Sequence, residues 1–150
     1  MPRVPNARFL DLFAGTGAVG IEAASRGAAE VVLVENHRGA ARLIGENLAL
    51  LGIQQGARLM AADALAAIAT LEKASAAPFD IVFLDPPYAR TGDYRLVLEA
   101  LASSPLLSGS TLVVAEHQKA LSPPESIGRL RQFRTLRQGD AALSFYRFSA

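Results

Sequence analysis

Cysteine and long apolar stretches are missing from this chain of 150 residues. The absence of cysteine excludes a disulfide framework, a thiolate metal site and cysteine-based catalysis, and it agrees with a reducing cytoplasm. No stretch approaches the roughly 18 uninterrupted apolar residues of a membrane-spanning helix. The opening segment Met1–Asn6 has two prolines and one arginine but no apolar run, so we expect no signal peptide and a cytoplasmic location.

The net charge is only +1, but the charges are unevenly distributed along the chain. Residues 1–116 carry nine Lys or Arg and 12 Asp or Glu, whereas residues 117–150 carry six and two. Most of the C-terminal excess comes from Arg129, Arg131, Arg134 and Arg137. Such a cluster suits an anionic partner, although a solvated surface would have the same composition.

Hydrophobic residues make up 51% of the chain and charged residues 19%, which is typical of one globular domain over residues 1–150. Apolar, often β-branched runs alternate with amphipathic runs, and this order favours a doubly wound α/β fold with a parallel sheet. We predict strands at 8–13, 31–34, 57–60, 79–84 and 112–115, and helices at 18–26, 39–51, 63–73 and 94–102.

The pattern changes after Ser122-Pro123-Pro124. Residues 130–136 and 142–148 have strand composition and are separated by Gln138-Gly139-Asp140. The sequence therefore predicts a Rossmann-like, mostly parallel sheet of seven strands whose last pair is an antiparallel hairpin at one edge.

The segment Asp11–Gly20 joins the first predicted strand to the first predicted helix, where doubly wound sheets bind their ligands. Its glycines allow a ligand to approach the backbone closely. Glu35 follows Gly15 by 20 residues and ends the second strand, where a carboxylate accepts hydrogen bonds from ribose hydroxyls. A nucleoside-bearing cofactor is expected, with candidate contacts from Phe13, Ala14, Gly15, Thr16, Gly17, Glu35 and Asn36.

The spacing Gly15-x-Gly17-x-x-Gly20 also matches the dinucleotide pattern, so NAD is an alternative. Asp11 argues against NAD because dinucleotide-binding strands are normally apolar at this position. S-adenosylmethionine carries a sulfonium and an ammonium but no pyrophosphate, and Asp11 could pair with the ammonium directly or through water. A less favoured alternative for Asp11 is a helix or turn cap.

Asp63 lies at the same predicted edge of the sheet, after the third strand. Its carboxylate could accept a hydrogen bond from an adenine amino group, with Ala64 and Leu65 beside the ring. Asp is also a favoured N-cap residue, and the two roles are compatible.

The segment Asp85-Pro86-Pro87-Tyr88 ends the fourth predicted strand. The two prolines have no N–H, so hydrogen-bond acceptors dominate this turn. The Asp85 carboxylate and the Pro86 carbonyl could each accept one hydrogen of an exocyclic amine and turn its lone pair toward an incoming methyl group. We expect Tyr88 to stack on a target base extruded from its own stack, and Asp85 to border the cofactor as well.

These motifs resemble S-adenosylmethionine-dependent amino methyltransferases. More narrowly, three segments are similar to segments of the bacterial enzymes that methylate guanine N2 in 16S ribosomal RNA. They are Asp-Leu-Phe-Ala-Gly-Thr-Gly, Gly-Ile-Glu-Ala-Ala-Ser-Arg-Gly-Ala and Val-Val-Ala-Glu-His. The resemblance covers residues 8–148 and implies a class I methyltransferase fold with S-adenosylmethionine as the cofactor. It also implies ribosomal RNA or the small ribosomal subunit as the partner, with Arg129, Arg131 and Arg134 as candidate RNA contacts.

One departure is that this family usually carries a basic segment ahead of the first strand, whereas only Met1–Ala7 precede it here. The Asp-Pro-Pro-Tyr motif does not separate guanine N2 from an adenine or another amine. A DNA adenine methyltransferase, an NAD-dependent oxidoreductase and a non-catalytic RNA-binding protein remain alternatives. His37 and His117 lack the spacing of metal ligands, so no metal site is expected.

Overall fold

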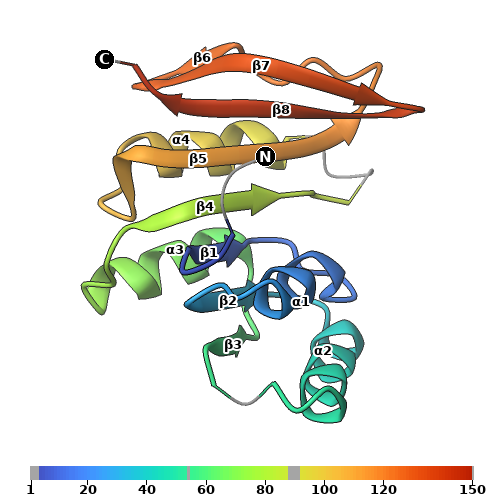
Figure 1. Cartoon of the computed structure of the whole chain (residues 1–150). Helices are drawn as coiled ribbons and strands as arrows, with labels where there is room; N and C mark the ends of the chain where they lie inside the picture. Colours follow the sequence, from blue (N-terminus) through green and yellow to red (C-terminus); the bar gives the residue numbers. More distant parts are fainter. Residues whose placement is uncertain (1–3, 54, 88–91, 150) are drawn as a thin grey trace.

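The apolar runs of the first two thirds of the chain form parallel strands, and the amphipathic runs between them form helices that pack on both faces of the sheet (Figure 1). The computed structural model describes residues 4–53, 55–87 and 92–149. In these residues the strands are β1 (Arg8–Asp11), β2 (Glu30–Val34), β3 (Ala57–Met60), β4 (Phe79–Leu84), β5 (Leu107–Gln118), β6 (Ser126–Ile127), β7 (Leu130–Gln138) and β8 (Ala141–Phe148). The helices are α1 (Ala18–Ser25), α2 (Arg38–Leu50), α3 (Ala64–Lys73) and α4 (Asp93–Ala102).

The strand order is β3-β2-β1-β4-β5-β8-β7-β6, with parallel pairing from β3 to β5 and antiparallel pairing from β5 to β6. The predicted doubly wound sheet and C-terminal antiparallel hairpin are therefore confirmed. The chain reverses its direction of winding between β1 and β4, which is where ligands bind in such sheets.

Two apolar clusters lie on opposite faces of the sheet. Leu10 and Val82 pack with α3 and α4 on one face, and Phe9 and Val31 pack with α1 and α2 on the other. Successive strand residues alternate between these faces, because side chains in a strand repeat every two residues. β1, β2 and β4 end at one edge of the sheet, where the residues after β2 and β4, Glu35 and Asp85, leave the core.

The structure differs from the sequence prediction mainly at strand ends. β1 stops at Asp11 rather than at residue 13, although the N–H groups of Leu12 and Ala14 still bond to the carbonyls of Phe83 on β4 and Val34 on β2. β5 is longer than predicted, since residues 116–118 pair with β8. The eighth strand, β6, has only two residues, too few to give a periodic pattern in the sequence.

No helix among the described residues is long and apolar enough to cross a membrane.

The first helix packs unusually close to the sheet. A Cβ on Gly20 would lie 2.5 Å from a methyl carbon of Leu33, so the third glycine of the motif permits this approach. The close packing fixes where α1 and its preceding loop stand at the edge of the sheet.

Candidate cofactor and amine site

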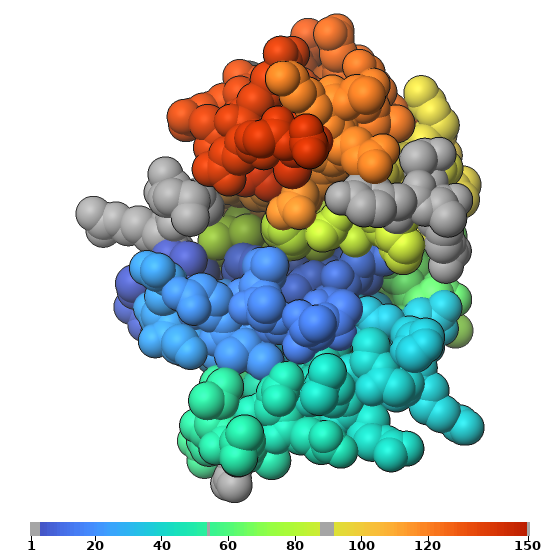
Figure 2. All heavy atoms as spheres, turned by 90° about the vertical axis from the view of Figure 1, so that its right-hand side faces the viewer, coloured from blue at the N-terminus to red at the C-terminus, as the bar shows by residue number. Residues whose placement is uncertain are grey.

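A cavity of about 1020 Å³ opens at the carboxyl edge of the parallel strands. Figure 2 looks onto this edge, with the end of β4 between the glycine-loop region and the C-terminal strands. The wall is built from the ends of β1, β2, β4 and β5 and from the starts of α2, α3 and α4. Of the predicted site residues, those that line it are Phe13, Gly15, Glu35, Asn36, Asp63, Ala64, Leu65, Asp85, Pro86 and Pro87.

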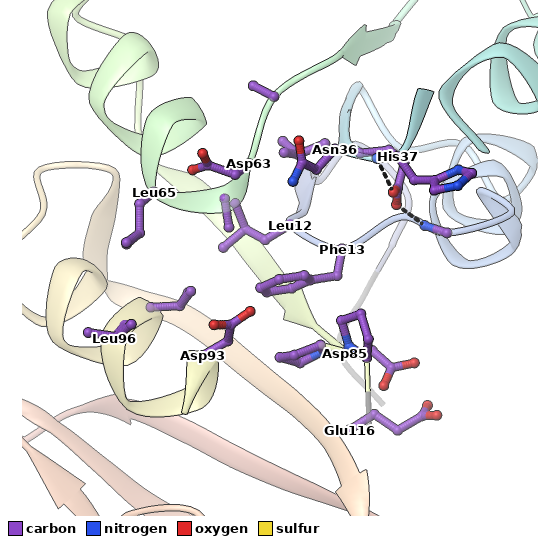
Figure 3. A pocket seen from close by; sticks show the side chains of 18 of the residues that line it. Leu12, Phe13, Asn36, His37, Asp63, Leu65, Asp85, Asp93, Leu96 and Glu116 are labelled. Atoms are coloured by element: carbon purple, nitrogen blue, oxygen red, sulfur yellow. Dashed lines mark hydrogen bonds between the residues drawn. The ribbon is translucent and has the colours of Figure 1, made fainter. Parts of the chain in front are cut away.

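The glycine loop is tied to the second strand through Glu35. One carboxylate oxygen of Glu35 accepts the N–H of Gly15 over 2.7 Å, and the other accepts the N–H of His37 over 2.8 Å (Figure 3). Gly15 has a φ of 57°, a left-handed conformation that favours glycine. A carboxylate can accept about four hydrogen bonds, so Glu35 retains capacity for two ribose hydroxyls.

Asp11 lies beneath this loop rather than in the wall of the cavity. It is 1% exposed, and its Oδ1 has no hydrogen-bond partner among the described residues. Burial raises the pKa of Asp11 to about 7; the backbone N–H groups of Phe13 and Gly20 oppose this, and the charges of Asp85 and Glu35 add to it. A buried acceptor without a donor suits a ligand ammonium or a water bound to it.

Asp63 is the N-cap of α3, where its Oδ1 accepts the N–H of Ala66 over 2.8 Å. It also lines the cavity, so the structure supports both predicted positions at once. In Figure 3 the side chains of Asp63 and Leu65 lie at the opposite end of the cavity from Asp85, with the Phe13 ring between them. Asp63 and Asp85 therefore border different ends of the cavity.

Asp85 leaves β4 directly into the cavity, and Pro86 behind it is buried. The pKa of Asp85 is raised to about 6, mostly by burial and in addition by the charge and hydrogen bond of the nearby Glu116 carboxyl. Tyr88, the predicted stacking residue, lies outside the described residues.

Besides Asp11, the predicted cofactor contacts Ala14, Thr16 and Gly17 do not line the cavity. Ala14 is buried and Gly17 is the N-cap of α1, so both shape the loop instead. The prediction did not assign Asp93, Glu116 and His117, which do line it. Glu116 and His117 follow Ala115 as Asp85 follows its paired residue Leu84, and this shared position near the ends of two strands is the sequence signal that could have identified them.

The charges of the wall favour a cationic cofactor. Among the described residues the lining contains five carboxylates (Glu35, Asp63, Asp85, Asp93 and Glu116) but one arginine, Arg38. A sulfonium and an ammonium fit such a wall, whereas a pyrophosphate would be repelled. The Gly15 N–H, which a dinucleotide phosphate would need, is already bonded to Glu35. The residues present therefore fit S-adenosylmethionine better than NAD.

The predicted RNA-contact arginines do not all lie together. Arg131 pairs with Arg147, and Arg134 with Phe145, on the sheet face that carries α1 and α2. The guanidinium of Arg134 lies 5.9 Å from the Phe145 ring, and that of Arg147 lies 3.9 Å from the Phe133 ring. Arg129 instead lies 4.2 Å from the ring of Phe148, which belongs to the opposite face.

Comparison with known proteins places this geometry in a family. A family model described as Conserved hypothetical protein 95 matches residues 1–147. The Bacillus subtilis protein named "Putative rRNA methyltransferase YlbH" is 32% identical over 97% of this chain and 78% of its own length. Ribosomal RNA small subunit methyltransferase D of Escherichia coli is 34% identical over 78% of this chain, a match that spans 56% of the E. coli protein.

Solved structures agree with the fold. A conserved hypothetical protein of Streptococcus pyogenes superposes with a TM-score of 0.85 at 36% identity, covering 97% of this chain and 88% of the other. SMU.776, described as a methyltransferase complexed with SAH, has a TM-score of 0.78 over 96% of this chain and 46% of its own, and at 14% identity it shows the fold alone. The predicted family, class I methyltransferase fold and S-adenosylmethionine cofactor are confirmed, and the chain belongs to the Conserved hypothetical protein 95 family of methyltransferases.

Proposed function

We propose that this chain transfers a methyl group from S-adenosylmethionine to an exocyclic amine, N2 of a guanine in 16S ribosomal RNA. The observation that carries the proposal is the acceptor-rich turn at Asp85 and Pro86, which borders the same acidic cavity as Glu35 and Asp63. A cofactor site alone would suit many methyltransferases. The turn adds a place where an amine, rather than a hydroxyl or a carbon, is held by acceptors on both hydrogens.

Different residues along the cavity would contact different parts of the cofactor. Glu35 is placed for the ribose hydroxyls, and Asp63 with Leu65 for the adenine at the far end. The orphaned Oδ1 of Asp11 beneath the loop suits the amino group or a water next to it. When bound, the cofactor supplies an electrophilic methyl group on a positively charged sulfur.

On the substrate side, Asp85 and Pro86 orient the amine. Its nitrogen lone pair is delocalised into the base and is a poor nucleophile in that state. With one hydrogen accepted by the Asp85 carboxylate and the other by the Pro86 carbonyl, the lone pair turns out of conjugation toward the methyl group. The rate gain from this arrangement comes from orientation and electrostatics. The proton that the methylated nitrogen loses passes to solvent, with Asp85 as the nearest carboxylate acceptor.

Guanine N2 and 16S RNA are supported by the resemblance of residues 8–148 and by the printed names of the relatives in Bacillus subtilis and Escherichia coli. A ribosomal substrate also supports a cytoplasmic location. The face of the β7–β8 hairpin with Arg131, Arg134 and Arg147 supports RNA over a small amine, because guanidinium groups pair with phosphates. Ala141, the first residue of β8, lines the cavity, so this face begins at its rim.

The deciding experiment maps methylated nucleosides in 16S RNA from cells with and without the gene. We expect loss of one N2-methylguanine, restored by the wild-type gene but not by one encoding Asp85→Ala. Complete small-subunit methylation in the deleted strain, with purified protein that binds S-adenosylmethionine, would redirect the search to another amine. Protein that binds RNA but neither S-adenosylmethionine nor its product would identify a non-catalytic RNA-binding protein.

A further inference from the structure

Glu116 on β5 stands beside Asp85, the residue that follows β4. β4 and β5 run parallel, and their last paired residues are Leu84 and Ala115, so the next residue on each strand enters the cavity at the same level. Both side chains line the cavity, and Figure 3 shows their carboxyl groups at the same end of it. The two acids therefore face one substrate position from neighbouring strands.

The backbone on either side of Glu116 is fixed. The hydroxyl of the buried Tyr94, on α4, donates to the carbonyl of Glu116 over 2.6 Å. The next residue, His117, is buried, with Nε2 2.8 Å from the Ser144 hydroxyl and Nδ1 2.8 Å from the Gln118 carbonyl. These contacts, with the pairing of Glu116 to Leu143 on β8, hold Glu116 in place next to Asp85.

The interaction between the two carboxyls favours the protonated form of Asp85. A hydrogen bond between two carboxyls requires a proton on one of them, and here protonated Asp85 is stabilised as the donor. Burial raises the pKa of Asp85 to about 6, and Glu116 is the further cause through its charge and this hydrogen bond.

Other titratable groups also lie around the cavity. Asp11 on β1 has a pKa of about 7, so it is still largely protonated and uncharged when Asp85 titrates. Asp93 on α4, Glu35 after β2 and Asp63 before α3 line the same cavity, as do Arg38 and the two histidines. The charge and the hydrogen bond that add to burial in raising the pKa of Asp85 come from Glu116.

We propose that Glu116 is a positioning residue for the amine site, which orients the Asp85 carboxyl across the cavity and raises the pH above which Asp85 becomes an acceptor. Below that pH, Asp85 keeps its proton, donates a hydrogen bond to Glu116 and is lost as an acceptor for the substrate amine. Above it, Asp85 is ionised and accepts. This inference rests on the proposed function for its catalytic consequence, but the coupling of the two carboxyls is a property of the protein itself.

The coupling is tested without any reaction. Carbon-13 labelling of the aspartate carboxyls gives six signals, of which Asp85 is assigned by its loss in Asp85→Asn. In Glu116→Gln the amide replaces a charge with a hydrogen-bond donor, so we expect the Asp85 midpoint to move to lower pH by roughly half a pH unit or more. The matched control is Glu99→Gln, an exposed glutamate on α4 paired with Arg95. An unchanged Asp85 midpoint in Glu116→Gln overturns the proposal.

Kinetics then test the consequence for the amine site. The acidic limb of the kcat profile should move with the carbon-13 midpoint in Glu116→Gln. Glu116→Ala should lower kcat at its plateau roughly tenfold while the Kd for S-adenosylmethionine stays the same, and Glu116→Gln should recover most of that loss. A plateau kcat in Glu116→Ala equal to the wild type overturns the positioning role. If the midpoint moves but wild-type protein methylates no guanine RNA, the coupling stands and the proposed function fails.

Discussion

The carboxylate of Glu35, which follows β2, accepts the N–H of Gly15 in the loop after β1 over 2.7 Å. The contact joins the end of β2 to the loop after β1 and also uses the N–H of His37. The loop is thus held in its left-handed conformation by the same side chain that is placed for the ribose. One residue shapes the site and contacts the ligand, which reduces the ordering that binding requires.

Replacing Glu35 by alanine should therefore weaken cofactor binding in two ways at once. We expect the Kd for S-adenosylmethionine, measured by calorimetry, to rise at least about tenfold, since a lost charged hydrogen bond costs roughly 1.5–3 kcal/mol. Glu46→Ala, an exposed glutamate on α2, is the control and should bind as the wild type does. Equal affinity in Glu35→Ala and Glu46→Ala would remove Glu35 from the cofactor site.

Asp85→Ala should separate binding from transfer. The substitution removes the carboxylate acceptor but leaves the ends of β1 and β2 intact, so S-adenosylmethionine should bind nearly as before. Methyl transfer should fall at least ~10²-fold, which corresponds to about 2.7 kcal/mol of transition-state stabilisation. Single-turnover rates with saturating cofactor measure the effect. A wild-type rate in this variant would contradict the role assigned to Asp85.

The order of elements and the position of the site follow from the sequence because strands and helices alternate and the motifs stand at strand ends. Asp63 and Glu35 needed only this topology to be placed. The burial of Asp11 was not foreseen, since the sequence does not show that the loop folds back over it. Glu116 was missed for a similar reason: a polar residue at a strand end is common, and only the register with β4 shows that it meets Asp85.

The arginines show how one irregularity changes a surface. In a regular strand, residues three apart such as Arg131 and Arg134 point to opposite faces. A bulge between Gln132 and Arg134 inserts one residue and returns Arg134 to the face of Arg131. Arg129 precedes β7 and follows Gly128, whose φ is 55°, and its guanidinium lies over the other face. No pattern in the sequence predicted this division.

The division leads to a prediction for RNA binding. Replacing Arg131 and Arg134 together by alanine should reduce the slope of log affinity against log salt concentration by roughly 1.4, at about 0.7 per phosphate contact for single strands. Arg129→Ala alone should leave the slope close to the wild type. Filter binding over a salt series with a 16S fragment provides the measurement. A slope that falls with Arg129→Ala but not with the double variant would place the RNA on the other face.

The buried carboxyl of Asp11 should make stability depend on pH. Its pKa is raised to about 7 in the folded protein from an ordinary value of 3.8, so the folded state binds more protons than the unfolded state between these limits. The stabilising effect is fully present below about pH 4, declines as the pH rises through 7 and is absent above it. Asparagine cannot ionise, so Asp11→Asn lacks this dependence.

Urea denaturation from pH 4.5 to 8 therefore tests Asp11 directly, because Asp85 and every other acid are common to both proteins. We expect the free energy of unfolding of the wild type, relative to Asp11→Asn, to decrease steadily toward pH 7 and then to level off. Asp140→Asn in the exposed β7–β8 turn is the control and should follow the wild type at every pH. A constant difference between wild type and Asp11→Asn across this range would mean that Asp11 ionises as easily in the folded chain as in the unfolded one, and its orphaned oxygen would then be solvated rather than buried beneath the glycine loop.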